Sequence, residues 1–75
     1  MNIKLYSNST NGQFVIANAD NYSIEVYNTL GQKVITVENA KSMETIDLSG
    51  NEAGNYIIRI TNSDNVVTRK INLIK

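Results

Sequence analysis

Apolar side chains recur at every second position in most of the clusters that they form along this chain. Ile24 and Val26 alternate with Ser23, Glu25 and Tyr27, and later apolar segments repeat the spacing. Alternate side chains of a β-strand point to opposite faces, and the Ile, Val, Thr and Tyr that dominate these clusters favour strands over helices. The pattern predicts an all-β chain with strands at about residues 2–6, 13–17, 23–27, 32–37, 44–48, 55–61 and 66–74.

Polar turn signals separate these segments. Asn and Gly tolerate the left-handed backbone conformation, and short Asn, Asp and Ser side chains hydrogen-bond nearby backbone groups. The spacing of the turns is typical of a β-sandwich. Such residues cluster at about residues 8–12, 18–21, 28–31, 49–54 and 62–65.

The segment Asn28-Thr29-Leu30-Gly31 fits a type I turn that is closed by a glycine. Glycine is favoured at that last position because a side chain there is strained in the left-handed conformation. We therefore expect a hairpin that joins the strands at residues 23–27 and 32–37, with Gly31 at a positive φ.

The last two predicted strands contain the strongest alternation, and we expect them to form the centre of the core. In the final strand the apolar Val67, Ile71 and Leu73 share one face. Arg69 falls on that same face and breaks its apolar character. The interruption predicts that Arg69 lies near an end of the sheet.

Length and composition limit the fold and its partners. A chain of 75 residues predicts one domain, at 1–75, and without cysteine its small core has no disulfide to brace it. Seven basic and seven acidic residues give no net charge, which argues against a nucleic-acid partner or a polybasic membrane patch. The chain has neither a bilayer-length apolar run nor a recognisable secretory signal, so export would depend on an attached segment.

The residue types favour no catalytic, metal or cofactor site. Histidine and cysteine are absent, and the carboxylates occur singly on predicted polar faces or in turns. The turn at residues 62–65 lacks the acidic spacing of a calcium loop, and the glycines do not form a phosphate-binding motif. We predict no enzyme activity, no cofactor and no small-molecule substrate.

The tyrosines leave two readings open. Tyr6, Tyr22, Tyr27 and Tyr56 could form a stacking platform for sugar rings, or they could pack their rings inward with the hydroxyl group reaching water. Inward packing is the commoner arrangement for a tyrosine in a strand.

A family resemblance is carried by two segments that occur in the family's order: VYNTLGQKV at 26–34 and IDLSGNEAGNYIIRITNSDNVVTRKINLIK at 46–75. The segment YSNSTNGQFVI at 6–16 adds to it. The chain resembles the C-terminal sorting domain of the type IX secretion system of Bacteroidetes, type A. The matching positions include Gly31 in the first segment, and Gly54, Tyr56, Lys70 and Lys75 in the second.

The resemblance implies a small immunoglobulin-like antiparallel β-sandwich that directs an N-terminally attached cargo across the outer membrane. The cargo would reach the periplasm by its own signal, and the type IX machinery would recognise the folded domain. A cell-surface sortase would remove the domain as the cargo is anchored or released. The implied location is therefore the cell surface or the medium, reached through the periplasm.

Two alternatives remain at this stage. An immunoglobulin-like binding or spacer module that holds carbohydrate or protein would have the same composition, because fold does not determine function. The last strand, with Lys70 and Lys75, could present an edge for recognition, or its lysines could only keep that edge soluble.

Overall fold

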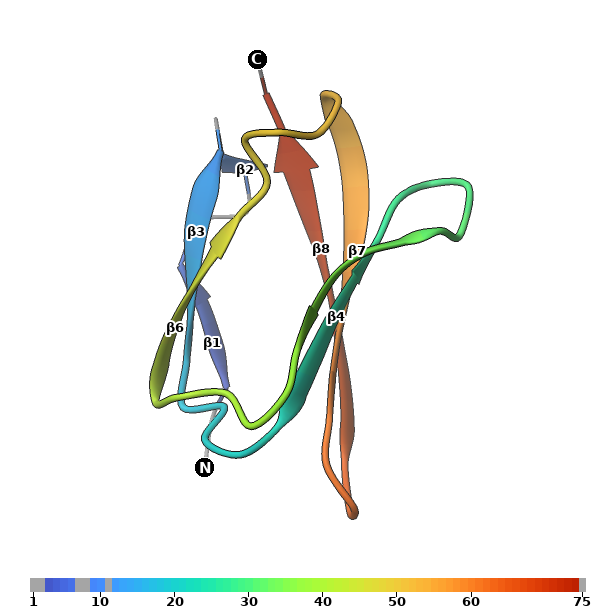
Figure 1. The fold of residues 1–75 in the computed structure, drawn as a ribbon. Coiled ribbons are helices and arrows are strands. Elements are labelled where there is room, and N and C mark those ends of the chain that lie inside the picture. Colours follow the sequence, from blue (N-terminus) through green and yellow to red (C-terminus); the bar gives the residue numbers. More distant parts are fainter. Residues whose placement is uncertain (1–2, 7–8, 11, 75) are drawn as a thin grey trace.

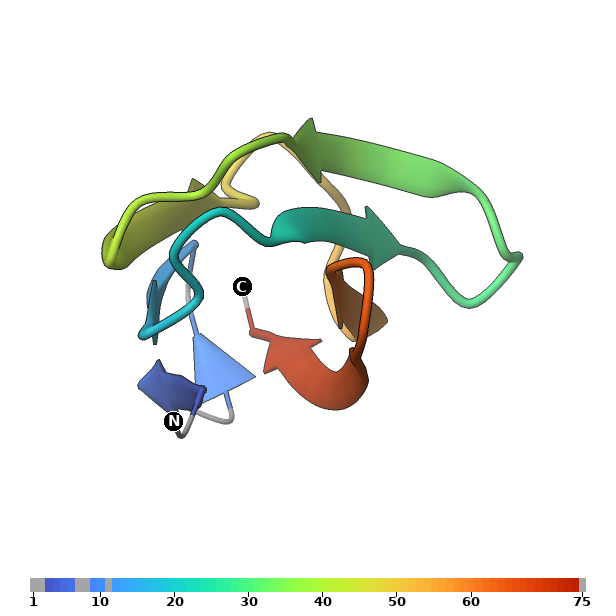
Figure 2. The ribbon, with the colours of Figure 1, turned by 90° about the horizontal axis from the view of Figure 1, so that it is seen from below.

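The computed structural model describes residues 3–6, 9–10 and 12–74. These residues form strands and connecting loops without any helix, so no helix among them could cross a membrane. Two sheets lie on opposite sides of a shared interior, as the view from the side and the view from below both show (Figures 1 and 2). The predicted all-β sandwich is confirmed.

The smaller sheet has three antiparallel strands. Its central strand is paired along its whole length with one neighbour and over three residues with the other. In spatial order the strands are β1 (Lys4–Tyr6), β3 (Gln13–Ala17) and β6 (Met43–Asp47).

The larger sheet has five strands and contains the longest pairing in the molecule. Eight consecutive residues of β7 pair with β8 in antiparallel register, from Gly54 opposite Leu73 to Thr61 opposite Val66. In spatial order the strands are β2 (Ser9–Thr10), β8 (Val66–Leu73), β7 (Gly54–Thr61), β4 (Ser23–Tyr27) and β5 (Lys33–Val37).

Each of the seven predicted strands is present, and the predicted ends agree within two residues. The structure adds β2, which lies inside the segment predicted as the turn at 8–12. Its Ser9 and Thr10 pair in parallel with Asn72 and Leu73 at the end of β8. The described residues of the N-terminal segment therefore contact the last strand of the chain through backbone hydrogen bonds.

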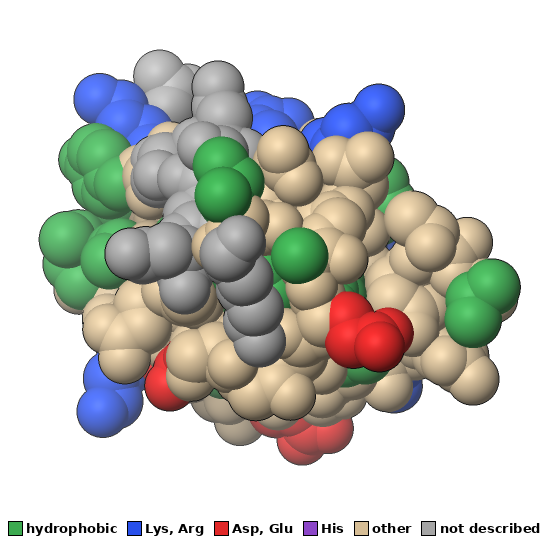
Figure 3. Space-filling model, turned by 90° about the horizontal axis from the view of Figure 1, so that it is seen from above, with side chains coloured by type: hydrophobic (Ala, Val, Ile, Leu, Met, Phe, Trp, Pro, Cys, Tyr) green, Lys and Arg blue, Asp and Glu red, His purple; other side chains and the backbone are tan. Residues whose placement is uncertain are grey.

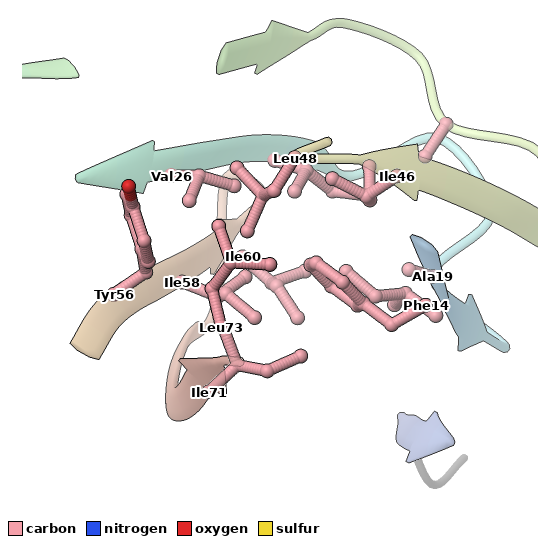
Figure 4. Packing of buried hydrophobic residues seen from close by; sticks show 13 residues of the cluster. Phe14, Ala19, Val26, Ile46, Leu48, Tyr56, Ile58, Ile60, Ile71 and Leu73 are labelled. Atoms are coloured by element: carbon pink, nitrogen blue, oxygen red, sulfur yellow. The ribbon is translucent and has the colours of Figure 1, made fainter. Parts of the chain in front are cut away.

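The inner faces of the two sheets form one hydrophobic core (Figure 4). Full burial of one aliphatic or aromatic side chain contributes about 1.5–3 kcal/mol, and this core has no disulfide to supplement it. The last two strands contribute to its centre, as predicted. The buried side chains of the core are Phe14, Ile16, Ala19, Ile24, Val26, Ala40, Ile46, Leu48, Tyr56, Ile58, Ile60, Ile71 and Leu73.

Arg69 lies opposite Ile58 in the β7–β8 register and therefore on the core side of the sheet, yet its side chain is exposed. It sits halfway along β8, the strand next to the two-residue edge strand β2 of the larger sheet. Among the described residues, β8 has a second neighbour only at Asn72 and Leu73, where β2 pairs. The lateral edge of the sheet thus gives Arg69 access to solvent, and its guanidinium donates to the Thr68 carbonyl.

Among the described residues other than glycine, the positive φ angles belong to asparagines. Asn18, Asn21 and Asn39 have φ angles of 65°, 65° and 54°. In the turn between β7 and β8, the Asn62 side chain accepts hydrogen bonds from the backbone N–H groups of Asp64 and Asn65 at 2.8 and 2.7 Å. These contacts confirm the hairpin-turn reading of residues 62–65.

Gly31 closes the β4–β5 turn with a φ of +83°, as predicted. Its N–H donates to the Asn28 carbonyl at 3.0 Å, and the Asn28 side-chain oxygen accepts from the N–H groups of Leu30 and Gln32. A Cβ atom at Gly31 would meet nothing within 4 Å. Backbone conformation alone therefore restricts this position.

We predict that Gly31→Val lowers the free energy of unfolding by about 1–2 kcal/mol, the cost of a positive φ for a side chain with a Cβ. Urea denaturation measures the change. Gly50→Val is the matched control, because Gly50 also has open space around it but no positive φ. Equal urea midpoints for the Gly31 variant and the unmodified chain would contradict the prediction.

Candidate functional site

A cleft of about 280 Å³ lies between two loops at one end of the sandwich. One loop is the β4–β5 turn, and the other connects β6 to β7; both lie in the upper part of Figure 1. The cleft is lined by residues 28–30, Val34 and residues 50–56.

The loop before β7 is held over a buried aromatic ring. Tyr56 is 5% exposed, and its hydroxyl donates to the backbone carbonyl of Glu52 at 2.5 Å. At the start of the loop, the Asn51 N–H donates to the Leu48 carbonyl at 2.9 Å. Gly54 begins β7 at a φ of +143°, a conformation that residues with a side chain rarely adopt. These features fix one wall of the cleft.

The β4–β5 turn forms the opposite wall. The Asn28 side chain accepts two backbone N–H bonds and donates to the Gln32 side chain at 3.0 Å, so the turn has an internal polar scaffold. Leu30 projects from this scaffold with 81% of its surface exposed, whereas Val34 packs against the core. An apolar side chain is therefore displayed at the rim.

The structure brings together two of the sequence segments that carry the family resemblance. Gly31 belongs to the turn on one side of the cleft, and Gly54 and Tyr56 line the other. Lys70 lies elsewhere, exposed on β8 opposite Ile57 of β7. Lys75 lies outside the described residues.

The sequence analysis identified Gly31, Gly54 and Tyr56, but it did not identify Leu30 and Glu52, which also belong to the site. The leucine in an otherwise polar turn could have indicated the site, since an apolar residue at the tip of a turn has no local structural role. The juxtaposition of the two loops depends on the packing of the sheets, which no local pattern encodes.

Charged side chains lie on the outer face of the larger sheet. Register places Glu25 opposite Arg59, and Tyr27 opposite both Ile57 and Lys33. Lys33 Nζ lies 3.3 Å from a Glu25 carboxylate oxygen. Viewed from above in Figure 3, basic side chains lie along the upper margin and also at the lower left, while acidic ones lie to the right of the centre and toward the lower margin. Charges of both signs therefore occur on this face.

Among the described residues, hydrogen bonds lower the pKa values of two carboxyl groups. The Tyr27 hydroxyl, which donates to Glu25 at 2.8 Å, lowers the pKa of Glu25, and Lys33 lowers it further. Hydrogen bonds from Ser49, including its N–H at 2.8 Å, lower the pKa of Asp47. A general acid needs a raised pKa, so neither shift favours acid catalysis.

The described residues show no group of three potential metal ligands among His, Cys, Asp and Glu. The four tyrosines also do not form a stacking platform: Tyr56 is buried, Tyr22 and Tyr27 are half-buried, and Tyr6 lies on the smaller sheet.

We predict that Tyr27→Phe raises the pKa of Glu25 toward its ordinary value of 4.5, because the largest cause of the depression is lost. Carboxyl-carbon NMR titration measures this pKa directly. A lowered folded-state pKa stabilises the fold above the ordinary pKa, and the stabilisation disappears as pH falls through the lowered value. The variant should therefore lose less stability on acidification than the unmodified chain.

Tyr6→Phe provides the control for that titration, because Tyr6 lies on the other sheet and does not contact Glu25. This control should leave the Glu25 pKa unchanged. A Glu25 pKa that is the same in the Tyr27 variant and the unmodified chain would contradict the assignment of the tyrosine hydroxyl as the main cause.

Comparison with known families identifies a matching family. The model for the secretion system C-terminal sorting domain matches residues 4–75 and so spans all eight strands. No curated protein sequence matches the chain. The family match confirms the resemblance carried by the motifs, and this family is one of sorting signals and not of enzymes. The chain therefore belongs to the secretion system C-terminal sorting domain family and is a type IX secretion signal for an N-terminally attached cargo that is secreted or displayed at the cell surface.

Proposed function

We propose that the folded sandwich, and not a short linear peptide within it, is what the type IX machinery recognises. One observation carries this proposal: the family match extends over residues 4–75, which include both sheets and every strand of the core. A linear signal would not need two inner faces that pack together. In this proposal the cargo enters the periplasm by a signal of its own and then crosses the outer membrane.

We place the proposed contact with the secretion machinery at the open side of β8. There the machinery would bind basic side chains and pair with backbone groups. Lys70 is exposed there, and Arg69 lies beside it. Among the described residues, β8 lacks a second partner strand before Asn72, so residues 66–71 offer unpaired backbone groups. β2 already pairs with residues 72–73, so the open edge of the last strand is shorter than the edge over residues 66–75 that we expect from the sequence. Exposed edges of this kind readily accept an added strand.

The later step of the proposal is removal of the domain at the cell surface by a sortase. Its support is the family resemblance. The proposed positions for recognition are Gly31, Gly54, Tyr56, Lys70 and Lys75. The glycines and the tyrosine shape the surface, whereas the lysines supply charge.

The decisive experiment fuses residues 1–75 behind a periplasm-directed fluorescent reporter in a bacterium with type IX secretion. We expect fluorescence at the cell surface and in the medium, and its loss in a strain without the secretion system. Reporter that stays in the periplasm of both strains, while circular dichroism shows a folded domain, would contradict the proposal and favour a binding or spacer module.

We further predict that Lys70→Glu reduces export of this fusion several-fold without unfolding the domain, because Lys70 is exposed. Lys41→Glu is the matched control: it makes the same charge change at an exposed residue before β6. Deleting residues 72–75 is less informative, since Leu73 is 1% exposed and its loss also damages the core. Normal export of the Lys70 variant would exclude Lys70 from recognition.

A further inference from the structure

The walls of the cleft combine apolar surface with one charge. Leu30, Val34 and Ala53 contribute aliphatic residues to the lining, which also includes the buried Tyr56. Among the described residues that line the cleft, Glu52 is the only charged one. A ligand with an apolar group beside a positive charge would match this lining, whereas an anion would face the Glu52 carboxylate.

The cleft is formed before any partner binds. The Tyr56 hydroxyl holds the backbone at Glu52, and three hydrogen bonds of the Asn28 side chain hold the opposite turn. A partner therefore does not have to order these loops, which removes a common cost of association. The 81% exposure of Leu30 leaves apolar surface that a partner could cover.

The size of the cleft restricts the occupant. A volume of about 280 Å³ lies below the range of typical small-molecule sites and suits one or two side chains of a peptide. The lining also contains the amide side chains of Asn51 and Asn55, which can hydrogen-bond a peptide backbone.

We propose that this cleft binds an extended segment of a type IX secretion component through one aliphatic side chain followed by a lysine or arginine. This inference rests on the proposed function and adds a second contact, separate from the β8 edge. The aliphatic side chain lies between Leu30 and Tyr56, and the cation pairs with Glu52. The cleft supplies specificity, because both features must be present together.

A titration tests the binding site without secretion. The probes are the peptides acetyl-Gly-Leu-Lys-Gly-amide and acetyl-Gly-Leu-Glu-Gly-amide, added to the ¹⁵N-labelled chain and followed by amide chemical shifts. The lysine peptide should shift the amides of residues 28–34 and 50–56, and the glutamate peptide should leave them in place. No shifts with the lysine peptide, or equal shifts with both, would overturn the proposal.

Export tests whether the secretion machinery uses the cleft. Leu30→Ser and Glu52→Lys change exposed residues, so both variants should fold and yet lose export of the reporter about tenfold, as expected for central contacts of an interface. Met43→Ser likewise replaces an exposed apolar side chain by serine, and Glu38→Lys makes the same charge reversal as Glu52→Lys. Both control positions lie outside the cleft lining, so these variants should be exported normally.

The outcomes separate the two proposals. Export of the unmodified fusion with normal export of both cleft variants would overturn the cleft and leave the sorting role intact. Failure of the unmodified fusion would overturn the proposed function, and the peptide titration would then decide alone whether the cleft binds the lysine peptide.

Discussion

Packing of the two inner sheet faces is the constraint on which the rest of the structure depends. The chain has no cysteine, and the described residues show a single ion pair, between Lys33 and Glu25 on the outer face. Exposed ion pairs stabilise a fold by about 0–1 kcal/mol, far less than a buried aliphatic core. The loops that form the cleft keep their positions because β4 and β7, which they extend, are adjacent strands anchored by Val26 and Ile58.

The sequence was a good guide wherever one strand has a buried and an exposed face. Alternation along Ser23–Tyr27 and Gly54–Thr61 predicts both the strands and their buried sides, since period two maps directly onto sheet faces. β2 escaped prediction because two residues cannot show a period, and its pairing with β8 is a contact between distant parts of the chain. The break that Arg69 makes in the apolar alternation indicated a position near an end of the sheet, and the structure places it on β8, whose lateral edge is open to solvent before Asn72 among the described residues.

In the candidate site, too, the sequence identifies single residues, whereas their arrangement in space depends on contacts between distant parts of the chain. Turn chemistry identified Gly31, and the resemblance identified Gly54 and Tyr56 as notable positions. Their meeting at one cleft follows from the antiparallel pairing of β4 and β7, which places the end of one strand beside the start of the other. No sequence motif marks Glu52. Its place in a site becomes clear only when the structure shows the β4–β5 turn on the other side of the cleft.

The parallel pairing of β2 with the end of β8 has a mechanical consequence. A cargo attached at the N-terminal side pulls first on β1, a strand of three residues at the edge of its sheet. Among the described residues, the next pairing along the chain joins Ser9 and Thr10 to Asn72 and Leu73, so tension at the cargo junction would reach the last strand through backbone hydrogen bonds. That pairing ends on residues that also belong to the β7–β8 ladder, where Leu73 lies opposite Gly54 and is buried in the core, so a pull on the cargo junction would be shared with the longest pairing in the molecule.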